Sequence, residues 1–297
     1  MNYGPLLIFI AAVLWGLDGV LRRFLFTLPP ITIVFFEHLI GAIIIAPFLY
    51  QAWKAETVRI TTREWAALGF VALLSGVLGT LFFTAALLQV NFIPFSVVFL
   101  VQKLQPIFAI LMAWFILRES PTPRYIVWAG LALVAGYFVT FPNGVINWGE
   151  GGAYVTAALF AFLAAIAWGS STAFSRYTLL QHSNTFVTGL RFLLTVPLAL
   201  VFVYALGAAE SLSSVTPMQL WTLAGIAVST GMVALWIYYR GLKTTTVRVS
   251  AIVELAFPMT AVLLDYFLYG TTLAASQYLA AAVLLYAMYR VSTLTQR

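Results

Sequence analysis

The stretch AVLWGLDGVLRR, residues 12–23, recurs as AIAWGSSTAFSR, residues 165–176, so that Trp15-Gly16 answers Trp168-Gly169 at an offset of 153 residues. Further matches follow in the same order: His38 with Arg191, Ala86-Leu87 with Gly241-Leu242, Ser96 with Ser250, and Pro106 with Pro258. The chain therefore consists of two copies of one unit. Paired copies inside a membrane are typical of proteins with a substrate pathway between the halves and a binding site near the bilayer midplane.

The composition is that of a protein that lies almost wholly in a membrane. Hydrophobic residues make up 63% of the 297 residues and charged residues only 8%, where a soluble domain carries about a quarter. The mean hydropathy is +1.00. Apolar runs of about 20 residues are long enough to cross the hydrocarbon core. They predict an all-α polytopic membrane protein with ten transmembrane helices, at 4–28, 31–51, 65–88, 93–117, 123–142, 152–178, 184–206, 217–241, 247–269 and 273–293.

The basic residues predict the orientation of the chain. Most of the 15 Lys and Arg residues fall on the side that holds the N-terminus. These are Lys54, Arg59, Arg63, Arg118, Arg124, Arg176, Arg240, Lys243, Arg248, Arg290 and Arg297. Arg22 and Arg23 fall on the opposite side. Positive loops mark the cytoplasmic face, so we expect a multi-pass protein of the cytoplasmic (inner) membrane with both termini cytoplasmic. The net charge of +6 is then an orientation signal, and no nucleic-acid partner is expected.

Each half holds five predicted helices, an odd number, so the second half enters the membrane from the opposite side. We expect a first repeat over residues 1–145 and an inverted second repeat over 146–297, related by a pseudo-two-fold axis in the membrane plane. The two repeats are expected to form one membrane domain around a central cavity.

Polar and aromatic residues within the spans predict what lines that cavity, because an ionisable group in hydrocarbon costs several kcal/mol unless it is paired or wet. Trp15, Asp18 and Arg22 share one helical stripe. The predicted substrate-binding residues are Trp15, Asp18, His38, Phe83, Phe99, Gln102, Lys103, Trp168, Arg191, Trp236, Tyr239 and Glu254. The aromatic rings would form apolar walls, Lys103 and Arg191 could hold a carboxylate, and Asp18 and Glu254 could hold an ammonium group. Together these groups suit a zwitterion with an apolar side chain.

These residues also have structural interpretations. Asp18, Glu37, Lys103, Arg191 and Glu254 can form internal ion pairs that fix helix register without touching substrate. His38 can be a neutral, hydrogen-bonded core histidine.

Proton exchange and bending are assigned to a few of the same positions. If transport is coupled to protons, the candidate proton sites are Asp18, Glu37, His38 and Glu254. Pro106 and Pro258 are candidate hinges, because proline interrupts the helical hydrogen-bond ladder.

The repeated motifs resemble the EamA-type drug/metabolite transporter superfamily over essentially the whole chain. The resemblance rests on the Trp-Gly pair of each half, on Arg191-Phe192, and on the series Ala86-Leu87…Ser96…Pro106…Glu119 with its second copy Gly241-Leu242…Ser250…Pro258. Two positions depart from the pattern: His38 stands where such repeats often have Arg, and Thr271 where Glu would end the motif. The resemblance implies that helices 1–4 and 6–9 surround the cavity and that helices 5 and 10 pack outside. It also implies export of small metabolites, most like the amino-acid-exporting branch, whose substrates include aromatic amino acids.

The favoured function is therefore a secondary transporter that exports aromatic or apolar amino acids and related metabolites by alternating access. Its expected partners are a small-molecule substrate and the lipid bilayer, with no cofactor, no metal and no catalytic residue. The alternatives are a membrane-embedded enzyme and a channel-like facilitator. Against an enzyme, the chain has no Cys, no H-E-x-x-H and only two histidines. It also lacks a Walker-type phosphate-binding loop.

Overall fold

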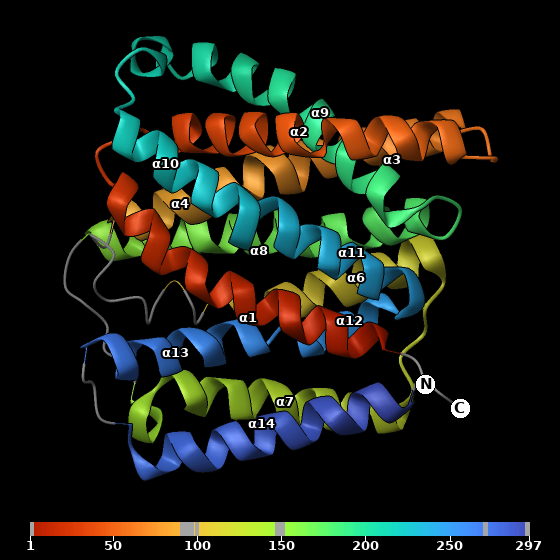
Figure 1. The fold of residues 1–297 in the computed structure, drawn as a ribbon. Coiled ribbons are helices and arrows are strands. Elements are labelled where there is room, and N and C mark those ends of the chain that lie inside the picture. The colour runs from red at the N-terminus through yellow and green to blue at the C-terminus, as the bar shows by residue number, and fades with distance from the viewer. Residues whose placement is uncertain (1–2, 90–97, 99–100, 146–151, 270–272, 295–297) are drawn as a thin grey trace.

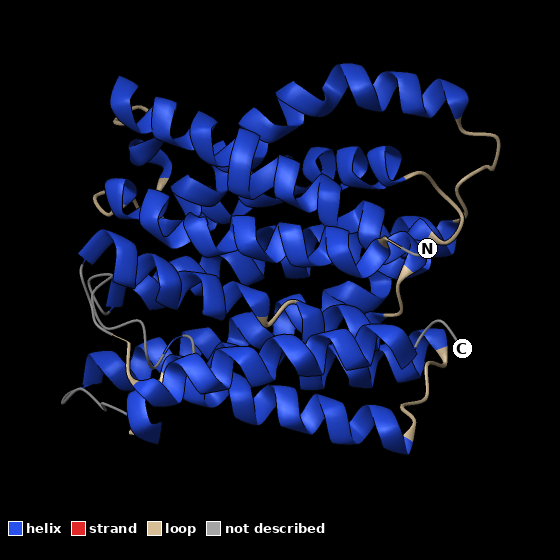
Figure 2. Cartoon of the chain, turned by 60° about the horizontal axis from the view of Figure 1, so that its bottom comes forward, coloured by secondary structure: helices blue, strands red, loops and turns tan. Residues whose placement is uncertain are grey.

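The computed structural model describes residues 3–89, 98, 101–145, 152–269 and 273–294 (Figure 1). Within these ranges the secondary structure is helical, with no strand (Figure 2). Helix is present within all ten predicted spans, and residues 93–97 and 99–100 of the fourth span lie outside the described residues. Eight of the helices described are long and apolar enough to cross a membrane. The prediction of an all-α polytopic fold is confirmed.

The helices of the first half are α1 (Gly4–Arg22), α2 (Pro30–Ala55), α3 (Thr62–Val71), α4 (Thr80–Gln89), α6 (Gln105–Leu117) and α7 (Pro123–Thr140). Those of the second half are α8 (Gly152–Leu179), α9 (Asn184–Ala205), α10 (Pro217–Ile226), α11 (Met232–Thr244), α12 (Val247–Val253), α13 (Ala256–Tyr269) and α14 (Ala275–Leu294). Two π-helical segments, η2 (Ala72–Gly79) and η5 (Ala227–Gly231), join α3 to α4 and α10 to α11. Each predicted third and eighth span is therefore one rod with a π-helical middle. Such segments are frequent at functional sites.

Corresponding helices begin with the same local device. A capping box starts α3, where Thr61 Oγ1 accepts from the Glu64 amide at 3.3 Å. Another starts α10, where Thr216 Oγ1 accepts from the Gln219 amide, also at 3.3 Å. A capping residue of this kind contributes about 1 kcal/mol. The repeat thus extends to the signals that begin each helix.

The packing is that of an inverted repeat. The second helix of each half packs on its counterpart, α2 on α9, and so does the fifth, α7 on α14. The first helix of each half crosses to the other half: α1 packs on α11 and α13, and α8 packs on α4 and α6. In Figure 1, α1 and α8 run in opposite directions, and α7 and α14 lie together at the bottom of the view. The opposite directions are those predicted from the odd number of helices in each half, and the family resemblance implied that α7 and α14 pack outside the other helices.

The repeated Trp-Gly pair has a packing reason. A Cβ on Gly16 would lie 3.3 Å from the Phe257 carbonyl oxygen, and a Cβ on Gly169 would lie 2.6 Å from the Gln105 carbonyl oxygen. Gln105 and Phe257 are themselves corresponding residues, each one position before its proline. Glycine therefore lets the first helix of one half approach the fourth helix of the other closely, which is a common packing device in membranes.

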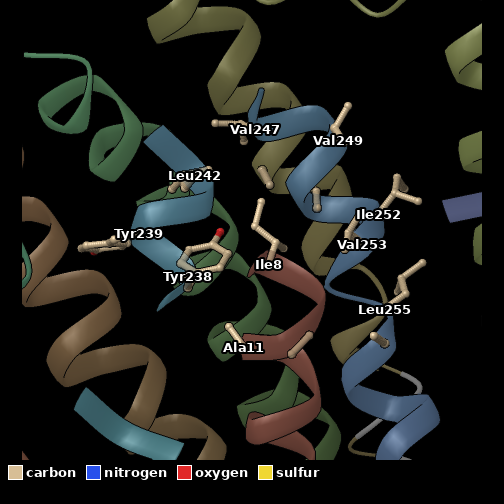
Figure 3. Close-up of a cluster of buried hydrophobic side chains, with 14 of the residues drawn as sticks. Ile8, Ala11, Tyr238, Tyr239, Leu242, Val247, Val249, Ile252, Val253 and Leu255 are labelled. Carbon is tan, nitrogen blue, oxygen red and sulfur yellow. The ribbon is translucent and has the colours of Figure 1, made fainter. Parts of the chain in front are cut away.

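A fully buried apolar cluster holds α1 against the second half (Figure 3). Ile8 and Ala11 of α1 belong to this cluster together with Leu242 of α11 and Val247 and Ile252 of α12, all with 0% exposure. This close packing fixes α1, α11 and α12 relative to one another. The polar side chains that these helices present to the cavity are therefore held in place as well.

Both predicted hinges coincide with a break in a helix. The chain turns at Lys103 and Leu104, just before α6, and Pro106 lies in the first turn of α6. Two residues separate α12 from α13, and Pro258 lies in the first turn of α13. The backbone tightens at both places: the Leu104 amide donates to the residue three before it at 3.0 Å, and the Leu255 amide does so at 3.2 Å. That these breaks flex during function stays a prediction.

Candidate functional site

A cavity of about 170 Å³ lies between the two halves. Of the predicted substrate-binding residues, ten line it: Trp15, Asp18, His38, Phe83, Gln102, Lys103, Trp168, Arg191, Tyr239 and Glu254. Glu37, Pro106 and Pro258 line it too. Phe99 lies outside the described residues. Ten side chains that the sequence predicts to line a cavity therefore lie around one cavity in the structure. Their contact with substrate remains a proposal.

Two aromatic pairs face the cavity, one from each combination of halves. Trp15 of the first half packs on Tyr238 of the second, with ring centroids 5.0 Å apart and planes at 52°. Trp168 of the second half packs on Phe83 of the first, at 5.1 Å and 49°. The tryptophans are 153 residues apart and their partners 155, so the pairs are equivalent under the repeat. Rings at this separation attract each other and offer flat apolar walls.

The prediction that Trp236 lines the cavity is wrong. Leu235, Tyr238 and Tyr239 of α11 line it, as residues three and four apart on a helix should. Trp236 directly follows Leu235, so its side chain is rotated by about 100° around the helix axis from that of Leu235. Its Nε1 donates to Thr185 Oγ1 at 2.9 Å. In Figure 3, Tyr238 and Tyr239 leave α11 in different directions and still reach different walls of the same cavity.

The first polar cluster, here the Arg22 cluster, consists of Asp18, Arg22, Glu37, Thr84 and Thr230. Arg22, only 3% exposed, forms ion pairs with Asp18 and, at 2.7 Å, with Glu37. It also donates to Thr84 Oγ1 at 3.4 Å, and Thr230 Oγ1 donates to Asp18 Oδ1 at 2.7 Å. Arg22, which the sequence places at the end of a span, is therefore buried, and Asp18 is not free to hold a substrate ammonium. For Asp18 and Glu37 the structure shows the internal ion pair.

The second, here the Arg191 cluster, consists of Ser75, Ser175, Arg191 and Tyr239. Arg191 donates from Nη2 to Ser75 Oγ at 2.7 Å and from Nη1 to Tyr239 Oη at 3.2 Å. Ser175 Oγ lies 2.9 Å from the same Tyr239 oxygen, and Trp168 Nε1 donates to the Ser75 carbonyl oxygen at 3.2 Å. Arg191 is 8% exposed, its Nε has no hydrogen-bond partner, and no carboxylate of the described residues pairs with it. A buried guanidinium thus faces the cavity without a counter-ion from the chain.

Glu254 is a carboxylate in the corresponding situation. Its Oε1 accepts from Tyr238 Oη at 2.7 Å and Ser250 Oγ at 2.8 Å, and its Oε2 accepts from Gln105 Nε2 at 3.0 Å. Within the described part of the chain it has no cationic partner. It lies at the break between α12 and α13, where a substrate can reach it from the cavity.

Two predicted residues line the cavity but direct their polar ends at helices. The Gln102 amide donates to the Ala161 carbonyl oxygen at 3.1 Å, and the Lys103 ammonium donates to Thr140 Oγ1. Gln102 aligns with Glu254 in the repeat, yet Gln105 is the residue that contacts Glu254. We therefore place Gln102 and Lys103 mainly in positioning the broken fourth helix.

His38 is buried, with 2% exposure, and packs on Phe192 at a ring separation of 5.0 Å. Its Nδ1 lies 2.8 Å from the Val34 carbonyl oxygen, and since a carbonyl only accepts, Nδ1 carries the proton. The other ring nitrogen is then the one available to the cavity.

Four lining residues were not among those predicted from the sequence: Ser75, Thr230, Tyr238 and Gln105. The repeat held a signal for most of them: at the later offset of 155 residues, Ser75 answers Thr230 and Phe83 answers Tyr238. The two hydroxyl residues lie within the π-helical segments η2 and η5. No sequence pattern used above identifies such segments.

The formal charges of the cavity lining cancel. Histidine aside, it carries three cations and three carboxylates: Arg22, Lys103, Arg191, Asp18, Glu37 and Glu254. A cavity of this kind favours a substrate that is neutral or zwitterionic as a whole, because a net charge would enter low dielectric without compensation. No group of three or more His, Asp or Glu among the described residues is placed to hold a metal ion.

Two inverted membrane repeats around a polar, ring-lined central cavity are an arrangement typical of membrane transporters. The sequence profile of the EamA-like transporter family matches the chain twice, over residues 2–141 and 155–293. The chain belongs to the EamA-like transporter family.

Two individual proteins are similar over nearly the full length. The riboflavin transporter ImpX of Fusobacterium nucleatum subsp. nucleatum is 33% identical over 292 residues, 98% of each chain. A solved structure described as a crystal structure of a protein superposes with a TM-score of 0.76 at 20% identity, covering 99% of this chain and 97% of the other. The second likeness shows the fold alone. The family and the relative both point to a transporter rather than an enzyme.

Proposed function

We propose that the protein is a carrier for a flat, ring-containing small molecule without net charge, and that riboflavin is the first candidate substrate. The observation that carries this proposal is the cavity itself: two equivalent aromatic pairs beside an arginine and a glutamate that lack ionic partners among the described residues. The name of the relative from Fusobacterium supplies the candidate.

The chemistry of a flavin suits these walls. Its fused rings can lie against Trp15 and Trp168, since aromatic rings gain from offset or tilted contact. Its ring edge alternates carbonyl oxygens with an N–H group. The Glu254 carboxylate can accept from that N–H, while Gln105 Nε2 and the Arg191 guanidinium can donate to the oxygens. Flavins without phosphate are uncharged, as the balanced lining requires.

An aromatic amino acid is the second candidate. Its carboxylate would bind Arg191 and its ammonium Glu254, and both protein groups are without an ionic partner in the described part of the chain. This is the zwitterion that the sequence predicts, with Glu254 alone taking the role first shared with Asp18.

Transport by alternating access fits the two-fold arrangement. The halves, residues 1–145 and 146–297, would rock against each other about the cavity, with Pro106 and Pro258 at the points of flexure. The excess of basic residues at the terminal end of the bundle supports cytoplasmic termini. If protons are coupled, Glu254 is the best-placed of the four candidate sites, since Asp18 and Glu37 are engaged by Arg22.

The test is counterflow of labelled riboflavin, tryptophan and phenylalanine in liposomes that hold only this purified protein, with and without a proton gradient. Saturable counterflow of riboflavin would support the first candidate, and counterflow of the amino acids alone would support the second. A channel would show neither saturation nor acceleration by substrate on the far side. Counterflow of none of the three would contradict the proposal.

Glu254→Gln gives a matched probe of the site. The amide keeps the size of the side chain but loses the charge and one accepting position. We expect the apparent affinity for the transported substrate to fall about tenfold or more, since a hydrogen bond to a charged group contributes about 1.5–3 kcal/mol. Unchanged affinity would remove Glu254 from the site.

A further inference from the structure

The Arg22 and Arg191 clusters occupy corresponding places in the two halves. Arg22 corresponds to Ser175 and Thr84 to Tyr239, and the contact between Arg22 and Thr84 is matched by the 2.9 Å contact between Ser175 and Tyr239. Each cluster also ties one half to the π-helical segment of the other. Thr230 of η5 bonds the first half in one cluster, and Ser75 of η2 bonds the second half in the other.

Corresponding helices that carry the two clusters run in opposite directions. Arg22 is the last residue of α1, which begins at the end of the bundle that holds both termini (Figure 1). Arg191 is the eighth residue of α9, which begins at that terminal end, and Glu37 is the eighth residue of α2, which begins at the other. With a rise of 1.5 Å per residue, Glu37 and Arg191 are about equally deep from opposite faces.

The two clusters differ in one respect: negative charge. Arg22 pairs with the carboxylates of Asp18 and Glu37. The corresponding residues in the second half are Ser171 and Leu190, which carry no charge. Arg191 consequently meets only hydroxyl groups, and its Nε has no partner although the residue is 92% buried. A guanidinium in such surroundings is costly unless an acceptor completes it. The cavity is where an acceptor can arrive.

We propose that the substrate supplies the oxygen acceptor that the Arg191 cluster lacks. An oxygen acceptor of the substrate, either a carboxylate or the carbonyl edge of a ring, binds the Arg191 guanidinium in the role that Asp18 and Glu37 play toward Arg22. Because Ser75 belongs to the first half and Arg191 to the second, the completed cluster ties the two halves together across the cavity. Substrate binding therefore favours the arrangement in which the halves are joined at this cluster, whereas the Arg22 cluster is completed by the chain's own charges. This inference rests on the proposed function and assigns the polar contact that couples binding to movement.

The variant Ser75→Asp tests the idea directly, with Ser75→Asn as its control of equal size. The new carboxylate would lie on Arg191, where the serine oxygen is 2.7 Å from Nη2. It would occupy the place of the substrate oxygen. We expect Ser75→Asp to bind riboflavin or tryptophan at least tenfold more weakly than Ser75→Asn, and Arg191→Gln to lose at least tenfold against Arg191→Lys.

A second measurement separates this mechanism from mere damage. Without ligand, Ser75→Asp should melt higher than Ser75→Asn, because it pairs a buried cation. The rise in melting temperature that riboflavin or tryptophan gives the wild-type protein should be absent from Ser75→Asp. Tryptophanamide, which has no carboxylate, distinguishes the sources of the oxygen. If the amino-acid carboxylate is the group, tryptophanamide binds the wild-type protein at least tenfold more weakly than tryptophan, and if the ring carbonyl is the group, riboflavin alone shows the Ser75→Asp effect.

Equal affinity of Ser75→Asp and Ser75→Asn for a ligand that the wild type binds would overturn the inference and leave the proposed function standing. So would Arg191→Gln with wild-type affinity, which also decides the matter if Ser75→Asp does not fold. A wild-type protein that binds neither riboflavin nor tryptophan would instead overturn the proposed function, and this inference with it.

Discussion

Replacing Arg22 with glutamine tests how the chain closes the Arg22 cluster. In the native protein the guanidinium lies between Asp18 and Glu37, and the three side chains together carry one negative charge. Arg22→Gln leaves two carboxylates, 9% and 6% exposed as residues, with no cation between them. Glu37→Gln leaves a neutral pair of Asp18 and Arg22. Arg22→Gln therefore removes both ion pairs and leaves carboxylates without a cation, whereas Glu37→Gln removes only the pair between Arg22 and Glu37 and leaves no charge unpaired.

The magnitudes follow from burial. Stranding one partner of a buried ion pair costs about 3–5 kcal/mol. Here Thr230 still donates to Asp18 at 2.7 Å, so we expect about 4 kcal/mol for Arg22→Gln. Glu37→Gln loses one charge-assisted hydrogen bond of 2.7 Å and strands nothing, which gives about 1.5–2 kcal/mol. At about 2 °C per kcal/mol, the melting temperature falls by roughly 8 °C and roughly 3–4 °C respectively.

The assay is thermal unfolding of the purified protein in one detergent at a fixed scan rate, because membrane proteins often unfold irreversibly. The double variant Arg22→Gln/Glu37→Gln removes one of the stranded carboxylates and should melt above Arg22→Gln alone. The reasoning is refuted if Arg22→Gln melts within about 2 °C of the wild type, or if the double variant melts below it.

Two further predictions concern single positions. Gly79→Ala should lower the melting temperature, because the new Cβ would overlap the Trp168 indole and lie 3.0 Å from a backbone carbonyl oxygen. Gly130→Ala should instead stabilise the protein by about 0.5–1 kcal/mol, because no atom lies within 4 Å of its new Cβ. Equal melting of the two variants would contradict the close approach at Gly79. Trp236→Phe should keep the substrate affinity within about twofold, since Trp236 faces away from the cavity, while Tyr238→Phe should lower it about tenfold by removing the hydroxyl 2.7 Å from Glu254. The reverse order in a binding assay would restore Trp236 to the site.

Much of the site was predictable because the sequence motifs that contain its residues occur in both halves of the chain. Trp15 and Trp168 were identified by the repeat alone, and both line the cavity. Arg191 and Glu254 were identified because charge within a span is costly, and both face the cavity without ionic partners among the described residues. These inferences depend on sequence neighbours and on the membrane as a solvent, which need no tertiary structure.

Other residues could not be placed in this way. Trp236 was predicted to line the cavity and Tyr238 was not, because the rotation of α11 about its axis decides which of them faces the cavity. That rotation is set by η5, since a π-helical segment changes the phase of every residue after it. Arg22 was placed at the end of a span, on the membrane side opposite the termini, and only its neighbours Asp18 and Glu37 show why it is buried.

The sequence by itself determined an all-helical membrane protein of two inverted repeats, because apolar length, helix-starting signals and the parity of the spans are local or countable properties. It also determined the kinds of side chain in the cavity. Only the tertiary structure decided which charges neutralise each other: Arg22 is satisfied by the chain, whereas Arg191 and Glu254 are left to the cavity. The reason is that ion pairing between helices depends on their rotation and depth, which are fixed by packing contacts between residues as far apart in sequence as Asp18 and Thr230.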